Sequence, residues 1–401
     1  MTRQILYTIL ARGASTALNF LIALLVARHC GPSIKGEVTL LITTVWFFIF
    51  LSNILGGQAL IYLLPRNRSE QLLIPAYIWC FIVSVIGFAF LKFSSLIAVQ
   101  HITSVIIISF FSSITALHQT LLYARKQIYH ANLLQVIPLG IVVIGLAINF
   151  YVLQTENVFA YIISAGVGYF ISTIISFALV IREFNLSHIK ERVDWSEVLL
   201  SLQHGFLFQL VEVLQLLNLR YYFFQLGNQQ GMQYLGIFSV GISVLESVWL
   251  IPRSINTVNY IHISHQSSHA DSYRETLLLL KINYIWCALA LVALFLIPPQ
   301  VYTWVFGNGF AEVKHAVRFL FPGIWIYSGW WVLFSYYSGV GKYKPLIVSS
   351  ALGALVLVVL SHYLLPLYVM SGAGLAATFS FTVATFVLGI YFFVLDKNGK
   401  H

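Results

Sequence analysis

The sequence predicts an all-α polytopic membrane protein with about twelve transmembrane helices. Of its 401 residues, 59% are hydrophobic and only 9% are charged, and the mean hydropathy is +0.86. A soluble protein has too little interior to bury that much apolar surface. Apolar stretches of about 20 residues, enough to cross about 30 Å of hydrocarbon, recur along the whole chain. These stretches are continuous rather than alternating, which indicates helices and not barrel strands.

Charged or turn-rich breaks divide the apolar sequence into two sets of predicted spans. The first set covers residues 5–28, 38–63, 72–91, 102–123, 132–153 and 158–181. After a polar segment, the second set covers residues 198–224, 233–255, 276–297, 316–339, 344–365 and 372–395. Weak parallels between the halves suggest an internal repeat. We therefore expect an N-terminal six-helix lobe over residues 1–190 and a C-terminal six-helix lobe over residues 191–401.

Lysine and arginine residues indicate the orientation in the membrane. With the N-terminus inside, the cytoplasmic segments hold clearly more of these residues than the opposite face, as the positive-inside rule requires. Both termini are therefore expected in the cytoplasm. This topology and anionic headgroups explain the net charge of +9, so no nucleic-acid partner is expected. The loops are too short for a soluble catalytic domain, and the first span is too long for a signal-peptide core.

No metal site and no bound cofactor are predicted. The three cysteines are isolated from one another and lack any metal-ligand spacing. His262, His265 and His269 have helical spacing, but their surroundings are typical of a cytoplasmic connection rather than of a metal site.

Polar residues within the predicted spans are the candidate functional residues, because a charge at bilayer depth is costly and usually faces a cavity or the bundle interior. On a helical projection, one face of the first span carries Thr8, Arg12, Ser15, Thr16 and Asn19. One side of the seventh span carries Ser201, His204, Gly205, Gln209, Glu212 and Gln215. These two polar stripes belong to equivalent helices of the two halves.

Two interpretations of the stripes remain open. In the first, they line a central hydrophilic cavity, where Arg12, Asn19, Gln209 and Gln215 bind an anionic substrate and Glu212 carries a proton or an ion. In the second, they are helix-packing interfaces held by interhelical hydrogen bonds, and the Arg12 side chain extends to the cytoplasmic surface.

Five other basic residues are weaker candidates for substrate binding. They are Arg253, near the end of the eighth span, Lys281, in the ninth, and Arg28, Arg220 and Arg318, near the outer surface. Each of these long side chains is expected to reach the headgroups instead. Embedded cations outnumber embedded anions, which suits a phosphate-bearing substrate better than a cationic one.

Four stretches of the sequence resemble motifs of the polysaccharide-repeat-unit flippases (Wzx-type, O-antigen transporters) of the multidrug/oligosaccharidyl-lipid/polysaccharide exporter superfamily. They are ARHCGPSIKGEVTLL, QYLGIFSVGISVLESVWLIPRSI, YSGVGKYKPLIVSS and LYVMSGAGLAATFSFTVATF. Their order and spacing extend the resemblance over nearly the whole chain. The chain departs from the family pattern at Asn218, where many relatives carry Asp, and at Phe238, and these departures concern ion coupling rather than fold.

The resemblance implies two six-helix lobes around a central cavity that opens alternately to each side. The implied substrate is an undecaprenyl-pyrophosphate-linked oligosaccharide repeat unit, carried across a bacterial inner membrane for surface polysaccharide synthesis. No covalent step is implied, so the chain is not expected to be an enzyme. H⁺ or Na⁺ is a possible coupling ion. The implied partners are the lipid-linked substrate, membrane lipids, a polysaccharide polymerase and chain-length proteins.

Two other functions remain open. A cation-coupled exporter of small cationic drugs, built on the same superfamily fold, would carry more embedded acids than Glu212 alone. A membrane-embedded polysaccharide polymerase or lipid-linked glycosyltransferase would show a sizeable outer loop or clustered acidic residues, and the sequence shows neither.

Overall fold

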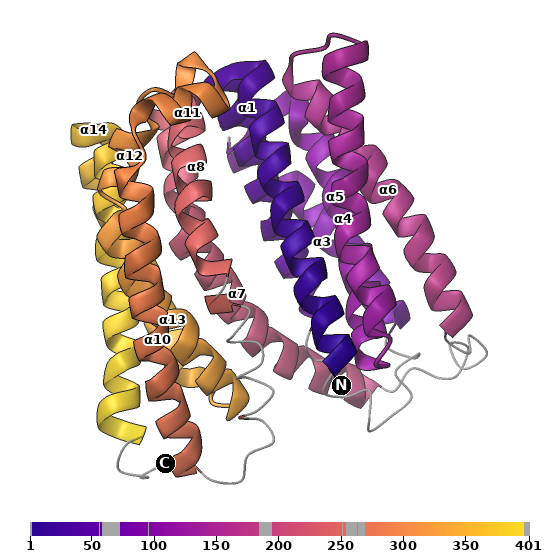
Figure 1. Ribbon diagram of the computed structural model, residues 1–401. Helices are drawn as coiled ribbons and strands as arrows, with labels where there is room; N and C mark the ends of the chain where they lie inside the picture. The colour runs from indigo at the N-terminus through magenta and orange to yellow at the C-terminus, as the bar shows by residue number, and fades with distance from the viewer. Residues whose placement is uncertain are drawn as a thin grey trace. The chain divides into compact units, whose positions relative to one another are not determined.

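A computed structural model describes residues 2–55, 57, 73–94, 96–183, 195–250, 252–253, 263 and 269–396. All regular structure in these ranges is helical, so the predicted all-α fold is confirmed. The first elements are α1 (Thr2–Ser52), α3 (Leu73–Ser94), α4 (Val99–Ala124), α5 (Ile128–Ala147), η2 (Ile148–Val152) and α6 (Val158–Glu183) (Figure 1). The later elements are α7 (Trp195–Gln229), α8 (Met232–Glu246), η4 (Ser247–Trp249), α10 (His269–Leu296), α11 (Pro299–Phe306), η5 (Asn308–Phe310), α12 (Val313–Arg318), α13 (Phe321–Gly339), α14 (Tyr343–Ile390) and η6 (Tyr391–Asp396).

The two longest helices, α1 and α14, each contain a break. They have 51 and 48 residues, which at 1.5 Å per residue is about 72–77 Å, more than twice a bilayer core of about 30 Å. The break in α1 is at Gly31, with φ 74° and ψ 179°, a conformation that is essentially restricted to glycine. The break in α14 is at Val369, with φ 49°. Each long helix therefore supplies two of the predicted spans.

The described residues form twelve α-helices when the broken helices α1 and α14 are each counted once. Seven helices meet both the length and the composition of a membrane span, and an eighth is added if the bent pair Asn308–Ala316 and Phe321–Gly339 is taken as one. The broken helices α1 and α14 each count once in that number. The chain is therefore a multi-pass membrane protein.

The chain divides into two compact units. Unit 1 comprises Met1–Cys30 and Glu37–Val213, and unit 2 comprises Gly31–Gly36 and Leu214–His401. A short segment of α1 thus belongs to unit 2, and α7 is shared between the units. The predicted lobe boundary at residues 190 and 191 lies outside the described residues and stays a prediction.

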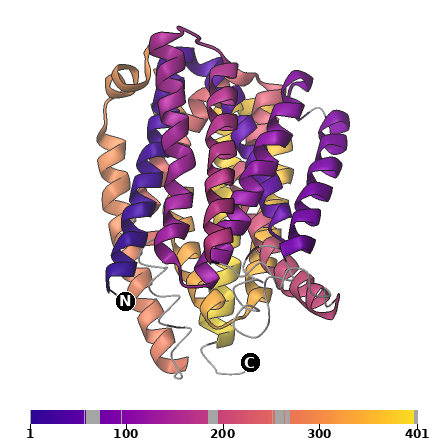
Figure 2. The ribbon, with the colours of Figure 1, turned by 90° about the vertical axis from the view of Figure 1, so that its right-hand side faces the viewer.

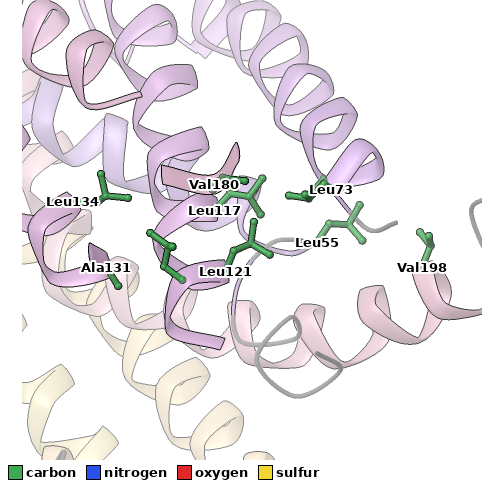
Figure 3. Close-up of a cluster of buried hydrophobic side chains, with 10 residues drawn as sticks. Leu55, Leu73, Leu117, Leu121, Ala131, Leu134, Val180 and Val198 are labelled. Carbon is green, nitrogen blue, oxygen red and sulfur yellow. The ribbon is translucent and has the colours of Figure 1, made fainter. Parts of the chain in front are cut away.

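In unit 1, helices α3, α5 and α6 pack around α4, and α5 and α6 run side by side (Figure 2). An apolar cluster joins the ends of several elements of this unit (Figure 3). It contains Leu55, Leu73, Ala76, Leu117, Leu121, Leu122, Ala131, Leu134, Val180 and Val198. Each of these side chains is at most 6% exposed. The cluster therefore fixes the first turns of α7 against α3, α4 and α6.

A buried polar chain links α3, α4 and α6 within unit 1. The Tyr77 hydroxyl is 2.6 Å from His118 Nε2, and His118 Nδ1 is 2.7 Å from Ser176 Oγ. The Ser176 hydroxyl donates in turn to the Thr173 carbonyl at 2.8 Å. A neutral His118 that accepts from Tyr77 and donates to Ser176 satisfies every group in this chain.

In unit 2, residues 31–36 pack directly on the first turns of α8. A Cβ atom added to Gly36 would overlap the Met232 carbonyl, and one added to Gly236 would overlap the Pro32 carbonyl. The backbones of the segment and of α8 can approach this closely only because both positions are glycine. The glycines of two family-like motifs, GPSIKG and QYLG, therefore form one packing contact.

Asn218 joins α7 to both halves of α14. Its amide donates to the Ser350 carbonyl at 2.8 Å, and its oxygen accepts from the Ser380 hydroxyl at 2.9 Å. The Ser380 hydroxyl also lies 2.8 Å from the Gly353 carbonyl. Asn218 is fully buried, so a neutral amide fills a position where an unpaired carboxylate would be costly.

The Gly36–Gly236 contact predicts that Gly236→Ala lowers the free energy of unfolding by about 1–3 kcal/mol, the usual cost of overpacking. The added Cβ has no room beside the Pro32 carbonyl. Thermal unfolding of detergent-purified protein would measure the change. Gly13→Ala is the matched control, since no atom lies within 4 Å of its added Cβ and alanine favours a helix. Equal melting temperatures for the two variants would contradict the contact.

Candidate functional site

Arg253 lies over two tryptophan rings in unit 2. Its guanidinium carbon is 4.1 Å from the centre of the Trp331 ring and 5.2 Å from the centre of the Trp249 ring. Trp249 is in η4, one helical turn before Arg253 in the sequence, and Trp331 is on α13. Both rings attract the cation through their negative faces. The two rings therefore fix the position of the Arg253 side chain.

The two tryptophans belong to a larger aromatic cluster of unit 2. The cluster consists of Trp249, Tyr327, Trp330, Trp331, Phe334 and Phe381. Tyr327, at its centre, stacks on Phe381 at 4.4 Å and lies 5.6 Å from Trp249 between ring centres. Gln215 donates from Nε2 to the Tyr327 hydroxyl oxygen at 3.0 Å. Two predicted substrate-binding residues, Gln215 and Arg253, therefore contact the same cluster.

The indole nitrogen of Trp331 is a buried donor beside Arg253. It has no hydrogen-bond partner among the described residues, whereas the indole nitrogen of Trp249 donates to the Ile324 carbonyl at 3.1 Å. A buried N–H group without a partner is rare. A cation and an N–H donor side by side are the groups that recognise a phosphate oxygen.

A second charged group in unit 2 is the ion pair between Arg220 on α7 and Glu246 on α8. Two hydrogen bonds of 2.7 Å join the guanidinium to the carboxylate, and the two side chains are 12% and 16% exposed. The expectation that Arg220 reaches the headgroups is wrong, because a bidentate carboxylate partner is available within the protein. Glu246 is thereby neutralised at its site.

Lys35 is buried near this pair, within unit 2. It belongs to the segment 31–36, is 4% exposed, and donates from Nζ to the Ser239 hydroxyl at 3.3 Å. Arg220 is close enough to act on it electrostatically. Residues 31–36 therefore bring a positive charge into the interior of unit 2.

The stripe of the first span lies in unit 1, and its polar groups mainly contact their own helix. Ser15 and Thr16 donate to the carbonyls four residues earlier, and the Asn19 amide donates to the Ser15 carbonyl at 2.9 Å. Ser15 is buried, Arg12 is half-buried, and Thr16 and Asn19 are exposed. The Asn19 side chain therefore lies on the exposed side of the stripe.

At the N-terminal end of the stripe, side chains of α4 and α5 join it. Asn132 donates to the Thr8 hydroxyl at 3.2 Å and accepts from the Tyr123 hydroxyl at 2.7 Å. Arg12 acts electrostatically on Tyr123. Thr8 and Arg12 are therefore part of a polar network within unit 1, as the helix-packing interpretation expects.

The stripe on α7 is divided between the units at residue 213. Gln209 and Glu212 belong to unit 1 and Gln215 to unit 2. Gln209 is buried, and its Oε1 has no hydrogen-bond partner among the described residues, whereas Glu212 is half-buried. The side chains of Ser201 and His204 are outside the described residues.

Lys281 lies on the exposed face of α10, between exposed Leu278 and Ile285. It is not part of the aromatic cluster. His262 and His265 lie outside the described residues, as does the side chain of His269. Within the described part of the chain, no three His, Cys, Asp or Glu side chains are grouped to hold a metal ion.

Sequence reasoning missed Glu246 and Trp249. It considered Trp331 as a stacking surface for sugar rings or part of an interfacial belt, but did not predict its contact with Arg253. Glu246 lies within the predicted span 233–255, so the rule that marked Glu212 also applies to it. The tryptophans carried no such signal, because aromatic residues are common at membrane interfaces. Their position around Arg253 depends on the packing of α13 against η4, which spacing alone does not reveal.

Comparisons with known proteins identify the fold. No family profile and no sequence of a characterised protein matches the chain. An inward-facing multidrug resistance transporter of the MATE family, in the MOP superfamily, matches with a TM-score of 0.76 and 11% identity, over 97% of this chain and 98% of its own. The lipid II flippase MurJ in an inward closed conformation matches with a TM-score of 0.68 and 14% identity, over 96% of this chain and 86% of its own. A MOP-superfamily transporter from Pyrococcus furiosus matches with a TM-score of 0.69 and 14% identity, over 100% of this chain and 96% of its own. The chain therefore has the fold of MOP-superfamily transporters.

The Arg220–Glu246 pair predicts a strongly non-additive mutant cycle. Arg220→Met should destabilise the protein by about 3–5 kcal/mol, because it leaves a buried carboxylate without its partner. The double variant Arg220→Met/Glu246→Leu should regain most of that loss, since no charge then remains unpaired. Unfolding in mixed detergent and SDS would give the free energies of unfolding of the wild type, Arg220→Met, Glu246→Leu and the double variant. Strictly additive single effects would show that the pair is not coupled.

Proposed function

We propose that this chain is a flippase that carries undecaprenyl-pyrophosphate-linked oligosaccharide repeat units across the bacterial inner membrane. It would act by alternating access, with both termini in the cytoplasm, and would supply surface polysaccharide synthesis such as that of O-antigen. Polysaccharide polymerase and chain-length proteins are then natural partners. No bond is made or broken in this process.

The fold supports transport rather than catalysis. The chain's structural neighbours are transporters and a flippase. One of them is described as a lipid II flippase, and others are described in inward-facing and outward-facing conformations. A lipid-linked substrate needs shielding only for its polar part, since its tail can stay in hydrocarbon, and desolvation of that polar part is the main barrier.

The observation that carries the proposal is the group formed by Arg253, Trp331, Trp249 and Gln215. It combines a guanidinium held over two rings, an indole donor and aromatic faces. A guanidinium binds phosphate oxygens through parallel hydrogen bonds, and tryptophan faces offer a surface for sugar rings. We propose that this group binds the pyrophosphate and the adjoining sugar.

The remaining predicted residues complete the proposal. Arg12 and Asn19 on α1 and Gln209 on α7 would give unit 1 a polar surface for the same substrate. Lys281 would act at the exposed face of α10, where it can meet an anionic headgroup. Glu212 is proposed as the group that couples transport to H⁺ or Na⁺. Asn218 would take no part in coupling, since it carries no charge.

A cation-coupled multidrug exporter is the second candidate, and the MATE fold of one neighbour favours it. Such a protein needs carboxylates to bind cations. Glu246 is held by Arg220, so it would contribute little attraction to a cationic drug. A polysaccharide polymerase is a weaker alternative, because the neighbours are transporters and flippases.

Substitution of Arg253 tests the binding group directly. Arg253→Gln should lower apparent affinity for the lipid-linked repeat unit about tenfold or more, the value of hydrogen bonds to a charged group. Arg253→Lys keeps the charge but lacks the planar guanidinium with its parallel donors, so its apparent affinity should lie between those of wild type and Arg253→Gln. The measurement is translocation of a pyrophosphate-linked oligosaccharide in proteoliposomes. Arg318→Gln, at an exposed position on α12, is the matched control, and equal rates for all variants would exclude Arg253 from binding.

A deletion strain tests the function as a whole. Loss of surface polymer, with accumulation of lipid-linked repeat units on the cytoplasmic side, is the expected result. Complementation with Arg12→Ala or Glu212→Gln should fail at normal membrane abundance, because each removes one of the proposed working charges. Unchanged polymer and repeat units, together with lost resistance to cationic compounds, would support the exporter instead.

A further inference from the structure

The connection between α10 and α13 in unit 2 is itself helical. It consists of α11, η5 and α12, and Figure 1 shows α11 at the upper end of the unit. Phe295, near the end of α10, contacts Phe321, at the start of α13, with 5.4 Å between ring centres. The end of α10 and the start of α13 thus lie side by side, and the connection lies beyond them. With eight residues and a length of about 12 Å, α11 is too short to cross a bilayer.

Helix α11 is amphipathic. Its Tyr302 and Phe306 side chains are buried, whereas Val301 is exposed and Trp304 is 79% exposed. Only residues 297 and 298 separate α11 from the apolar helix α10, which has the length and composition of a membrane span. Tryptophan concentrates at the level of the headgroups, and short amphipathic helices lie along the membrane surface. We therefore expect α11 to lie at the interface, with Trp304 among the headgroups.

Helix α12 brings positive charge to the end of α10. Lys314 Nζ lies 5.6 Å from the centre of the Phe295 ring, and Arg318 is exposed one helical turn later, on the same side of α12. Neither cation forms an ion pair with any residue that the structure describes. Within residues 297–320 the only carboxylate in the sequence is that of Glu312. The connection therefore carries an excess of positive charge.

The position of α12 is fixed by contacts within unit 2. Its Val313 and Ala316 side chains are fully buried, and the helix packs on α8 and α14. On α14, the Ser371 hydroxyl lies 3.3 Å from His315 Nε2. Helix α12 thus holds its two cations at a defined place beside the end of α10.

An exposed apolar strip runs along α10 from this place. It consists of Ile285, Leu289, Val292 and Leu296, which share one side of the helix and are 58–72% exposed. The strip is about 16 Å long, close to one leaflet, which is half of about 30 Å of hydrocarbon. Positive charge above an apolar strip of this length matches the shape of one anionic lipid molecule. An acidic peptide would match the charge but leave the strip uncovered.

We propose that α10, α11 and α12 form a binding site for an anionic phospholipid such as phosphatidylglycerol. The lipid phosphate accepts a charge-assisted hydrogen bond from Lys314, and an acyl chain lies along the strip of α10. Trp304 lies beside the headgroup, and Arg318 adds to the positive field. A zwitterionic phospholipid also carries a phosphate, but its net charge is zero, so the excess positive charge attracts it less.

Hydrogen–deuterium exchange of the purified chain in nanodiscs, without substrate, tests the site. Residues 297–318 should exchange about two- to fivefold more slowly in nanodiscs that contain phosphatidylglycerol than in nanodiscs of phosphatidylcholine alone, as expected for attraction by one basic residue. Lys314→Gln should remove most of this difference, whereas Lys314→Arg, which keeps the charge, should retain it. Lys344→Gln changes an exposed lysine of α14 outside the site; it is the matched control and should behave as wild type.

Equal exchange of residues 297–318 in the two kinds of nanodisc would overturn the proposal, as would a lipid dependence that survives Lys314→Gln. Protection by soluble glycerol phosphate in phosphatidylcholine nanodiscs would overturn it in favour of a free anion. Slower exchange of residues 285–296 in nanodiscs that hold two copies of the chain, in either lipid, would assign the strip to a second copy instead.

Thermal unfolding of each variant provides the control for folding. Lys314 is only half-buried, so Lys314→Gln and Lys314→Arg should both melt close to the wild-type temperature. The exchange experiment needs no transport and no oligosaccharide. Its result is therefore independent of the proposed function.

Discussion

The constraint on which the structure depends is that polar groups within spans have no water and must be paired inside the protein. Serine and threonine hydroxyls donate to carbonyls of their own helices, and His118 is paired on both nitrogens. Arg220 is paired with Glu246. The groups that depart from this rule in the described residues, such as the Trp331 indole nitrogen and Gln209 Oε1, are therefore informative about ligand binding.

Hydropathy was enough to predict the all-α membrane fold, because helices that cross a membrane must be long and apolar irrespective of their neighbours. It could not predict that α1 continues through Gly31 or that α14 continues through Val369, since those breaks depend on what the chain packs against. The helical projection placed Gln215 on a polar face, and the structure shows that its partner is Tyr327. Pairings such as Arg220 with Glu246 join separate helices, so a single-helix projection cannot find them.

The family-like motifs have a physical explanation at the segment 31–36. Glycine at 36 and at 236 permits two backbones to touch, and Gly31 adopts a conformation closed to other residues. The glycines at these positions serve the packing and conformation of the backbone rather than substrate binding. The proposed binding group is separate from these glycines, although Trp249 and Arg253 lie in the later part of the same motif as Gly236. For this reason a likeness in fold to exporters and to a flippase leaves the cargo open.

The Arg220–Glu246 pair also has an electrical consequence. A single elementary charge that crosses the membrane field exchanges about 2.3 kcal/mol per 100 mV with the transmembrane potential. A bidentate pair moves as a dipole with no net charge, so rearrangement of the helices that carry it draws almost nothing from the voltage. The neutral amide of Asn218 behaves in the same way. These two sites in unit 2 can therefore change position at any membrane potential, and any voltage dependence of the cycle must originate at other groups.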